Sequence, residues 1–278
     1  MIAPTVALAL ALTCRPLHAA APPPTPTPVA QQDAEADVAA GIENVWALLE
    51  ERKVAEALDA TKRLAEQFPS SGRAHGIRAF VLAATQQSDE SERELRRAFD
   101  CDEYAPEAGM LKANQLANAQ KIGEAETLVR KARENHPESA VLDQLLGDIV
   151  TAGRDFESAL DIYLVGLGHA TSDRERLALL VKTGQAATQL GKYDVMETAM
   201  TRAMELKDDL RFWFTRADAR AKQAKFDAAL EDTATLLRRD DVRTTPQLAG
   251  QITALREAIL RDYTAKEGTI TPLVWALR

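Results

Sequence analysis

Several residue types are scarce in this 278-residue chain, and each scarcity excludes a class of protein. Phe, Trp and Tyr together make up 5% of the residues and β-branched runs are few, so intrinsic preferences favour helix over sheet. The two cysteines are too few for a small disulfide-stapled fold. The apolar run from Ile2 to Thr13 is too short to cross a bilayer as a stable helix. Since the composition is otherwise ordinary for a globular protein, with 46% hydrophobic residues, we expect an all-α fold stabilised by packing.

Motifs that carry chemistry are also missing from the sequence. The net charge is -8 and no dense Lys/Arg stripe occurs, which argues against nucleic acid as a partner. The histidines His75, His136 and His169 are widely spaced and show no metal-ligand pattern. No Gly-rich phosphate loop and no Gly-x-Ser-x-Gly elbow is present. We therefore expect a protein that is not an enzyme and that needs no cofactor and no metal.

The N-terminal segment predicts export. Residues 1–21 resemble a secretory signal peptide, because the apolar run is followed by Ala19-Ala20-Ala21, although no basic residue precedes the run. Cys14 keeps a second reading open, that of a bacterial lipoprotein leader whose lipid-bearing Cys becomes the mature N-terminus. We expect a periplasmic or secreted protein in the first case and a membrane-anchored lipoprotein in the second, with membrane contact only if Cys14 is lipidated.

The segment that follows the leader is predicted to be a flexible spacer. Residues 22–37 are expected to form a Pro-rich flexible spacer, because alternating Pro favours extended polyproline conformation. Once the leader is removed, Cys101 is the only cysteine, so no intramolecular disulfide can form. We expect Cys101 to be a small residue tucked at a helix end rather than a reactive thiol, since free Cys is usually buried.

Small residues recur along the chain at a fixed interval. One series has a 34-residue period and continues with relaxed spacing at Met196 and Ala229; its regular members are Ala57, Ser91, Ala125 and Ala159. A second series lies twelve residues earlier in each unit, at Ala79, Ala113, Gly147, Gly184 and Ala217. Small residues allow two helices to cross closely, so each repeat is predicted to be a helix pair. Pro69 and Pro137 lie at equivalent places, where they end the second helix of a pair.

These units resemble the tetratricopeptide repeat family over about residues 38–241. The resemblance rests on Gly147, Trp213 and Ala217, on Gly191-Lys192-Tyr193, and on the similar turns Arg154–Ala159 and Lys225–Ala229. It implies a right-handed α-solenoid of about six helix-turn-helix repeats. The first repeat departs most, because Trp46 is out of step and Val45 replaces the small residue. An insertion at Gly168–Arg174 is expected either to lengthen the next helix or to loop out.

Residues 242–278 are predicted to form a C-terminal capping helix and an apolar tail. Pro246 to Tyr263 is amphipathic, and a terminal repeat needs a cover for its exposed apolar flank. The tail from Ile270 to Leu277 is unusually apolar and should dock. Packing against its own C-terminal repeats is one interpretation, and a segment offered to a partner is the other.

The family resemblance implies a function in binding proteins. Such solenoids bind a peptide or helix in a concave groove formed by the first helix of each pair. One residue beyond each small position, and one turn later, the predicted groove residues are Trp46, Phe80, Asn114, Asn118, Asp148, Gln185, Gln189, Asp218 and Lys222. Trp46 and Phe80 could equally pack between helices. We expect a non-catalytic interaction scaffold acting outside the cytoplasm, or alternatively an outer-membrane-tethered lipoprotein assembly factor, with the partner's identity open.

Overall fold

The computed structural model describes residues 28–267, with side chains described for residues 34–266, and this part of the chain is helical without strands. The predicted leader, Cys14 and the apolar tail lie outside the described residues. The helices are α1 Pro28–Glu50, α2 Val54–Gln67, α3 Gly72–Ala84, α4 Ser88–Cys101, α5 Pro106–Asn118, α6 Ile122–Asn135, α7 Ala140–Ala152, α8 Phe156–His169, α9 Asp173–Leu190, α10 Tyr193–Leu206, α11 Leu210–Lys222, α12 Phe226–Arg238, α13 Asp240–Arg243 and α14 Pro246–Glu267.

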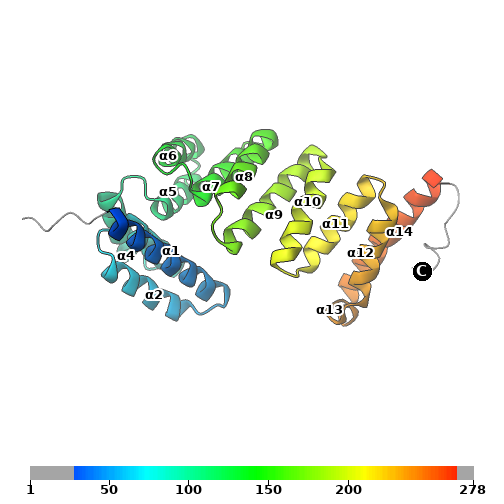
Figure 1. Ribbon diagram of the computed structural model, residues 1–278, viewed down its shortest axis with the longest axis horizontal. Helices are drawn as coiled ribbons and strands as arrows, with labels where there is room; N and C mark the ends of the chain where they lie inside the picture. Colours follow the sequence, from blue (N-terminus) through cyan, green and yellow to red (C-terminus); the bar gives the residue numbers. More distant parts are fainter. Residues whose placement is uncertain (1–27, 268–278) are drawn as a thin grey trace, which may run out of the picture.

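The helices pair in sequence order and the pairs stack into a curved array. Each helix packs mainly against its neighbours along the chain, and the first helices of adjacent pairs also meet, as α3 meets α5 and α7 meets α9. Helices α1 to α12 form six successive pairs. Figure 1 shows these helices following one another along the array, with α14 beside α12. The predicted all-α solenoid of about six repeats with a capping helix is confirmed.

The recurrent small residues are buried where the two helices of a pair cross. Ser91 Oγ donates a hydrogen bond to the carbonyl oxygen of Ala79 at 2.8 Å, so members of the two predicted series touch in the α3–α4 pair. In the α7–α8 pair a Cβ on Gly147 would lie closer to the ring of Tyr163 than real Cβ contacts allow. The sequence repeat therefore marks the points where the two helices of a pair cross. At these points a large side chain on one helix requires a small residue on the other.

The insertion before the fifth repeat lengthens a helix. Helix α9 has 18 residues, whereas its counterparts α3, α5, α7 and α11 have 13. Its start is fixed by a capping box, in which the Ser172 hydroxyl accepts from the Glu175 N–H and the Glu175 carboxylate accepts from the Ser172 N–H. Gly191, with φ +67°, ends the helix in the left-handed conformation. Of the two expected outcomes, a longer helix is observed.

The first helix begins earlier than the predicted spacer boundary. Helix α1 begins at Pro28, so residues 28–37 are helical rather than part of a flexible spacer, and residues 22–27 lie outside the described part. Pro at the first helical position is tolerated because its missing N–H would be unsatisfied there anyway. Val38, Ile42 and Val45 are buried on one face of α1, with 1%, 3% and 0% exposure. The helical spacing of these three explains why a larger residue replaces the usual small one at Val45.

The C-terminal cap and Cys101 both lie where the sequence predicted them along the chain. Helix α14 packs along α12 and buries Ile252 and Ile259 on the face predicted for it. Cys101 is the last residue of α4, as expected, but it is exposed rather than buried. Partial desolvation and the nearby carboxylates of Asp100 and Asp102 raise the pKa of its thiol, which favours the unreactive protonated form.

Candidate functional site

The predicted groove residues lie on the first helices of their pairs, and they differ in how far they are exposed. Asn114 and Asn118 on α5 are exposed, and their side-chain amides make no hydrogen bond with any residue that the structure describes. Lys222 on α11 is also exposed, and Asp218 one turn before it is half-buried. Polar side chains that project from a helix face without partners are available to a ligand.

The aromatic end of the groove contributes to packing. The rings of Trp46 and Phe80 lie 5.1 Å apart between centroids, and both pack against the core of the first two helix pairs. The Arg174 guanidinium lies 4.9 Å from the centre of the Trp46 ring and donates to the carboxylate of Glu43 at 2.9 Å. Since Glu43 and Trp46 belong to α1 and Arg174 to α9, the first and fifth repeats meet across the curvature of the solenoid.

Asp148 takes part in a network within the protein. It accepts a hydrogen bond from the Tyr163 hydroxyl at 2.7 Å and forms an ion pair with Lys182 at 2.8 Å. Desolvation of Tyr163, together with the neighbouring Asp148 carboxylate, raises the pKa of this phenol above its usual range. Asp148 therefore joins α7, α8 and α9 in addition to lining the concave face.

A hollow opens at the C-terminal end of the concave face. Its volume is about 610 Å³, and it lies between α9, α11 and the start of α14, with Met196 and Met200 of α10 at its floor. Gln185, Gln189 and Asp218 lie at this hollow, so the structure brings together three of the nine predicted groove residues there. Much of its remaining lining is apolar: Val181, Leu210, Phe212, Phe214, Leu248 and Ile252.

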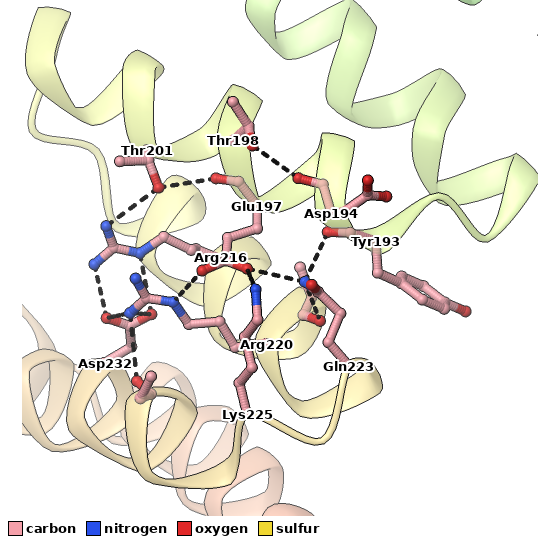
Figure 2. Close-up of polar contacts among 12 residues, drawn as sticks. Tyr193, Asp194, Glu197, Thr198, Thr201, Arg216, Arg220, Gln223, Lys225 and Asp232 are labelled. Atoms are coloured by element: carbon pink, nitrogen blue, oxygen red, sulfur yellow. Dashed lines mark hydrogen bonds and ion pairs between the residues drawn. The ribbon is translucent and has the colours of Figure 1, made fainter.

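A charged network holds together the helices that carry this hollow. Figure 2 shows Glu197 of α10, Arg216 and Arg220 of α11, and Asp232 of α12 pointing toward one another. Asp232 is 2% exposed and accepts from Arg216 at 2.7 Å and from Arg220 at 3.0 Å. Glu197 accepts from Arg220 at 2.9 Å and from Lys225 at 2.7 Å.

Glu197 is held in its ionised form by this network. Burial opposes the ionisation of Glu197, but hydrogen bonds from Lys225, Arg220 and Gln223 outweigh it and lower the pKa of Glu197 to about 2. Asp232 is satisfied on both oxygens by two guanidinium groups. Both carboxyl groups of the network thus have cationic partners on a neighbouring helix, which leaves neither of them buried without a partner.

Other buried carboxylates are also neutralised within the protein. Glu107 pairs with Arg73 at 2.7 Å, Asp143 with Arg133 at 2.6 Å, and Glu94 with Arg78 at 3.4 Å. Each pair links two helices near a junction between or within repeats. These three buried acidic residues therefore connect neighbouring helices of the fold.

The sequence patterns did not indicate several residues that lie at the candidate site. Arg174 lies in the insertion, and its contact with Glu43 spans 131 residues, a distance that no local pattern encodes. Lys182 was also missed, although a basic residue one turn before Gln185 on the same face could have indicated it. The apolar lining of the hollow was not predicted either, because groove and core positions alternate on the same helices.

Comparisons with known proteins show the fold. No family model and no curated protein matches the sequence. Among solved structures, the chain is similar to Cut9 in the Cut9–Hcn1 complex, with a TM-score of 0.56, 15% identity, and 80% of this chain and 43% of that chain covered. It thus spans less than half the length of Cut9.

Two bacterial structures are covered almost completely by this chain. For PilF of Pseudomonas aeruginosa the TM-score is 0.54 at 15% identity, with 80% of this chain and 99% of that chain covered. For PilW, a type IV pilus biogenesis factor, it is 0.51 at 12% identity, with 74% and 97% covered. The chain therefore has the tetratricopeptide-repeat fold.

Proposed function

We propose that this protein is a non-catalytic scaffold that binds a partner protein in its concave groove. The observation that carries this proposal is the pair of exposed, unengaged amides Asn114 and Asn118, one helical turn apart on the first helix of the third repeat. An amide side chain can both donate to and accept from a peptide backbone. A row of such groups on a concave surface suits an extended peptide or the polar edge of a helix.

The remaining groove residues extend this surface in both directions. Gln185, Gln189 and Asp218 continue it toward α14, and Lys222 adds an exposed charge one turn beyond Asp218. Toward the other end, Trp46 and Phe80 offer apolar area beside Arg174. The proposed partner therefore presents backbone or amide groups in its middle and apolar side chains at its ends.

We place this activity outside the cytoplasm, in the periplasm or as a secreted protein. Support comes from the signal-peptide-like residues 1–21. Within the residues that the structure describes, no helix is both long and apolar enough to span a membrane. Similarity in fold to PilF and PilW is compatible with this location.

The double substitution Asn114→Ala with Asn118→Ala tests the proposal. Affinity purification from the native cell envelope should recover the partner with the unaltered chain and lose most of it with the double variant. The melting temperature should stay nearly unchanged, because both amides are exposed. Gln67→Ala, which removes an exposed amide from the end of α2, should capture as well as the unaltered chain. A large fall in melting temperature, or equal capture by the double variant, contradicts the proposal.

A second candidate function is favoured by the position of Cys14 at the end of the apolar run. In this case the protein is a lipoprotein assembly factor tethered to the outer membrane. Intact mass of the mature protein distinguishes the two, because lipidation makes Cys14 the first residue and adds the mass of the acyl chains. Cleavage after about Ala20 removes Cys14 altogether.

A further inference from the structure

The hollow lies at the C-terminal end of the helix array, between α9, α11 and α14. It contains about 610 Å³, which lies within the range of roughly 300–1,000 Å³ typical of ligand sites. Phe214, Leu248 and Leu210 line it and are only half-buried, and they come from α11 and α14. A concave surface of this composition favours an apolar occupant with few charges.

The chain contains a segment with matching chemistry just beyond α14. Residues 268–277 carry no charged side chain, and Leu273, Trp275 and Leu277 are spaced two residues apart. In extended conformation such residues project to one side of the backbone. We propose that this segment, residues 268–278, binds in the hollow and that the protein covers the C-terminal end of its own groove.

The length of the segment fits this placement. Ile252 lies 15 residues before Glu267 on α14, which at helical rise corresponds to about 22 Å. Trp275 lies eight residues beyond Glu267, which in extended conformation spans up to about 27 Å. A chain that turns back at Gly268 therefore brings Trp275 about level with Ile252 when it is fully extended.

The face of α14 along which the segment would run carries small side chains. Ala254 and Ala258 follow Gln251 at helical spacing, and Gln251 lines the hollow. Ala254 is exposed and Ala258 half-buried, so the backbone of a docked segment can approach the helix closely. Gly268 can adopt the backbone angles that a reversal after the helix requires.

Charge also matches at the far end of the segment. Asp218 lines the hollow and forms no ion pair with any residue that the structure describes. Arg211, the basic residue of the lining, is paired with Asp209 at 2.6 Å. Arg278 is the one charged side chain in the segment, and its guanidinium complements Asp218.

A segment bound in the hollow limits which part of the groove is open to a partner. The covered residues include Gln185, Gln189 and Asp218, whereas Asn114 and Asn118 belong to α5 and are not part of the hollow. A partner that binds at α5 leaves the segment in place, and a partner that extends toward α14 has to displace it. The inference does not depend on the proposed function, because its test requires no partner.

A distance measurement on the full chain tests the inference. Spin labels are attached to Lys222→Cys, which is exposed on α11 outside the lining of the hollow, and to Ala276→Cys, which lies off the Leu273–Trp275–Leu277 side, with Cys14 and Cys101 replaced by Ser. Pulsed electron resonance should give one short, narrow distance distribution. Dilution with unlabelled chain should leave it unchanged. A broad distribution in the otherwise unaltered chain, or a short distance lost on dilution because the tail of a second copy supplies it, overturns the inference.

Two sets of variants separate docking from general effects on folding. Gln185→Arg with Gln251→Arg places charge in the hollow at exposed positions and should abolish the short distance, whereas Gln67→Arg on α2 should not. Leu273→Ser with Trp275→Ser alters the segment alone, so the solenoid keeps its fold, and it should abolish the short distance as well. Retention of the short distance in this second variant contradicts the inference.

Discussion

At the scale of single residues, the small side chains determine how closely the helices pack. Gly147 faces the Tyr163 ring and Gly184 faces the terminal methyl group of Met200. The two glycines occupy equivalent places in successive repeats, yet their neighbours differ in stiffness. An aromatic ring held by hydrogen bonds to Thr151 and Asp148 cannot yield, whereas a methionine methyl can rotate away.

The difference between these glycines gives a quantitative prediction. Gly147→Ala should lower the free energy of unfolding by about 2 kcal/mol, because the added methyl group displaces the Tyr163 ring. Gly184→Ala should cost less, since Met200 can repack. Gly123→Ala on α6 is the matched control, because nothing lies within 4 Å of its Cβ position. Urea unfolding measures all three, and an equal cost at Gly147 and Gly123 would show that the crossing is not tightly packed.

At the scale of helices, sequence patterns predicted the pairs but not their limits. The two small-residue series identified the crossing points, because burial of a small side chain is required wherever two helices meet. The start of α1 at Pro28 was missed, because alternating prolines indicate extended chain and mask the helix that follows. The exposure of Cys101 was missed because a helix end can be turned either way, and sequence alone does not say which.

The candidate groove was predictable only where it repeats. Asn114 and Asn118 follow from the helical register and are exposed as that register requires. The engagement of Asp148 by Lys182 and Tyr163 depends on the distance between α7, α8 and α9, which no pattern along the chain records. The hollow beside α14 depends in the same way on how the cap is positioned.

The last three helices of the repeat region are tied together by a network whose stability should depend on pH. Glu197 has a pKa of about 2 in the folded protein and an ordinary value of 4.5, so its contribution is present above pH 4.5 and is lost as the pH falls toward 2. Glu197→Gln should therefore cost about 2 kcal/mol at neutral pH and should lose less stability than the unaltered chain on acidification.

The control for this prediction lies on the same helix. Glu205 is exposed on α10, and Glu205→Gln should follow the unaltered chain at every pH. Chemical unfolding between pH 7 and pH 2.5 supplies the comparison. Parallel pH curves for Glu197→Gln and the unaltered chain would show that the network does not hold α10, α11 and α12 together.

At the scale of the whole molecule, curvature brings the first repeat to the fifth. Arg174 of α9 contacts both Glu43 and Trp46 of α1. These helices meet only through side chains, because their backbones do not approach each other closely. The side chains of α1 and α9 thus meet near Arg174, and the hollow lies farther along, between α9, α11 and α14. A ligand bound in the middle of the proposed groove would lie between the Arg174 contact and the hollow.

The contact at Arg174 predicts a change in solvent access with little change in stability. Arg174→Gln should increase acrylamide quenching of Trp46, measured with Trp213 and Trp275 replaced by Phe. The free energy of unfolding should change by less than about 1 kcal/mol, because the pair is partly exposed. Arg176→Gln, two residues along the same helix, should leave quenching unchanged. Identical quenching in both variants would place Trp46 in the core alone.

The central claim is that a partner protein occupies the concave face at α5, and site-specific photo-cross-linking in the native cell tests it most directly. A photoreactive side chain at Asn118 should yield a discrete cross-linked partner, whereas the same side chain at Gln67 on α2 should yield none. A partner captured from Gln67, or none captured from Asn118 while the unaltered chain still recovers its partner by affinity, would contradict the account.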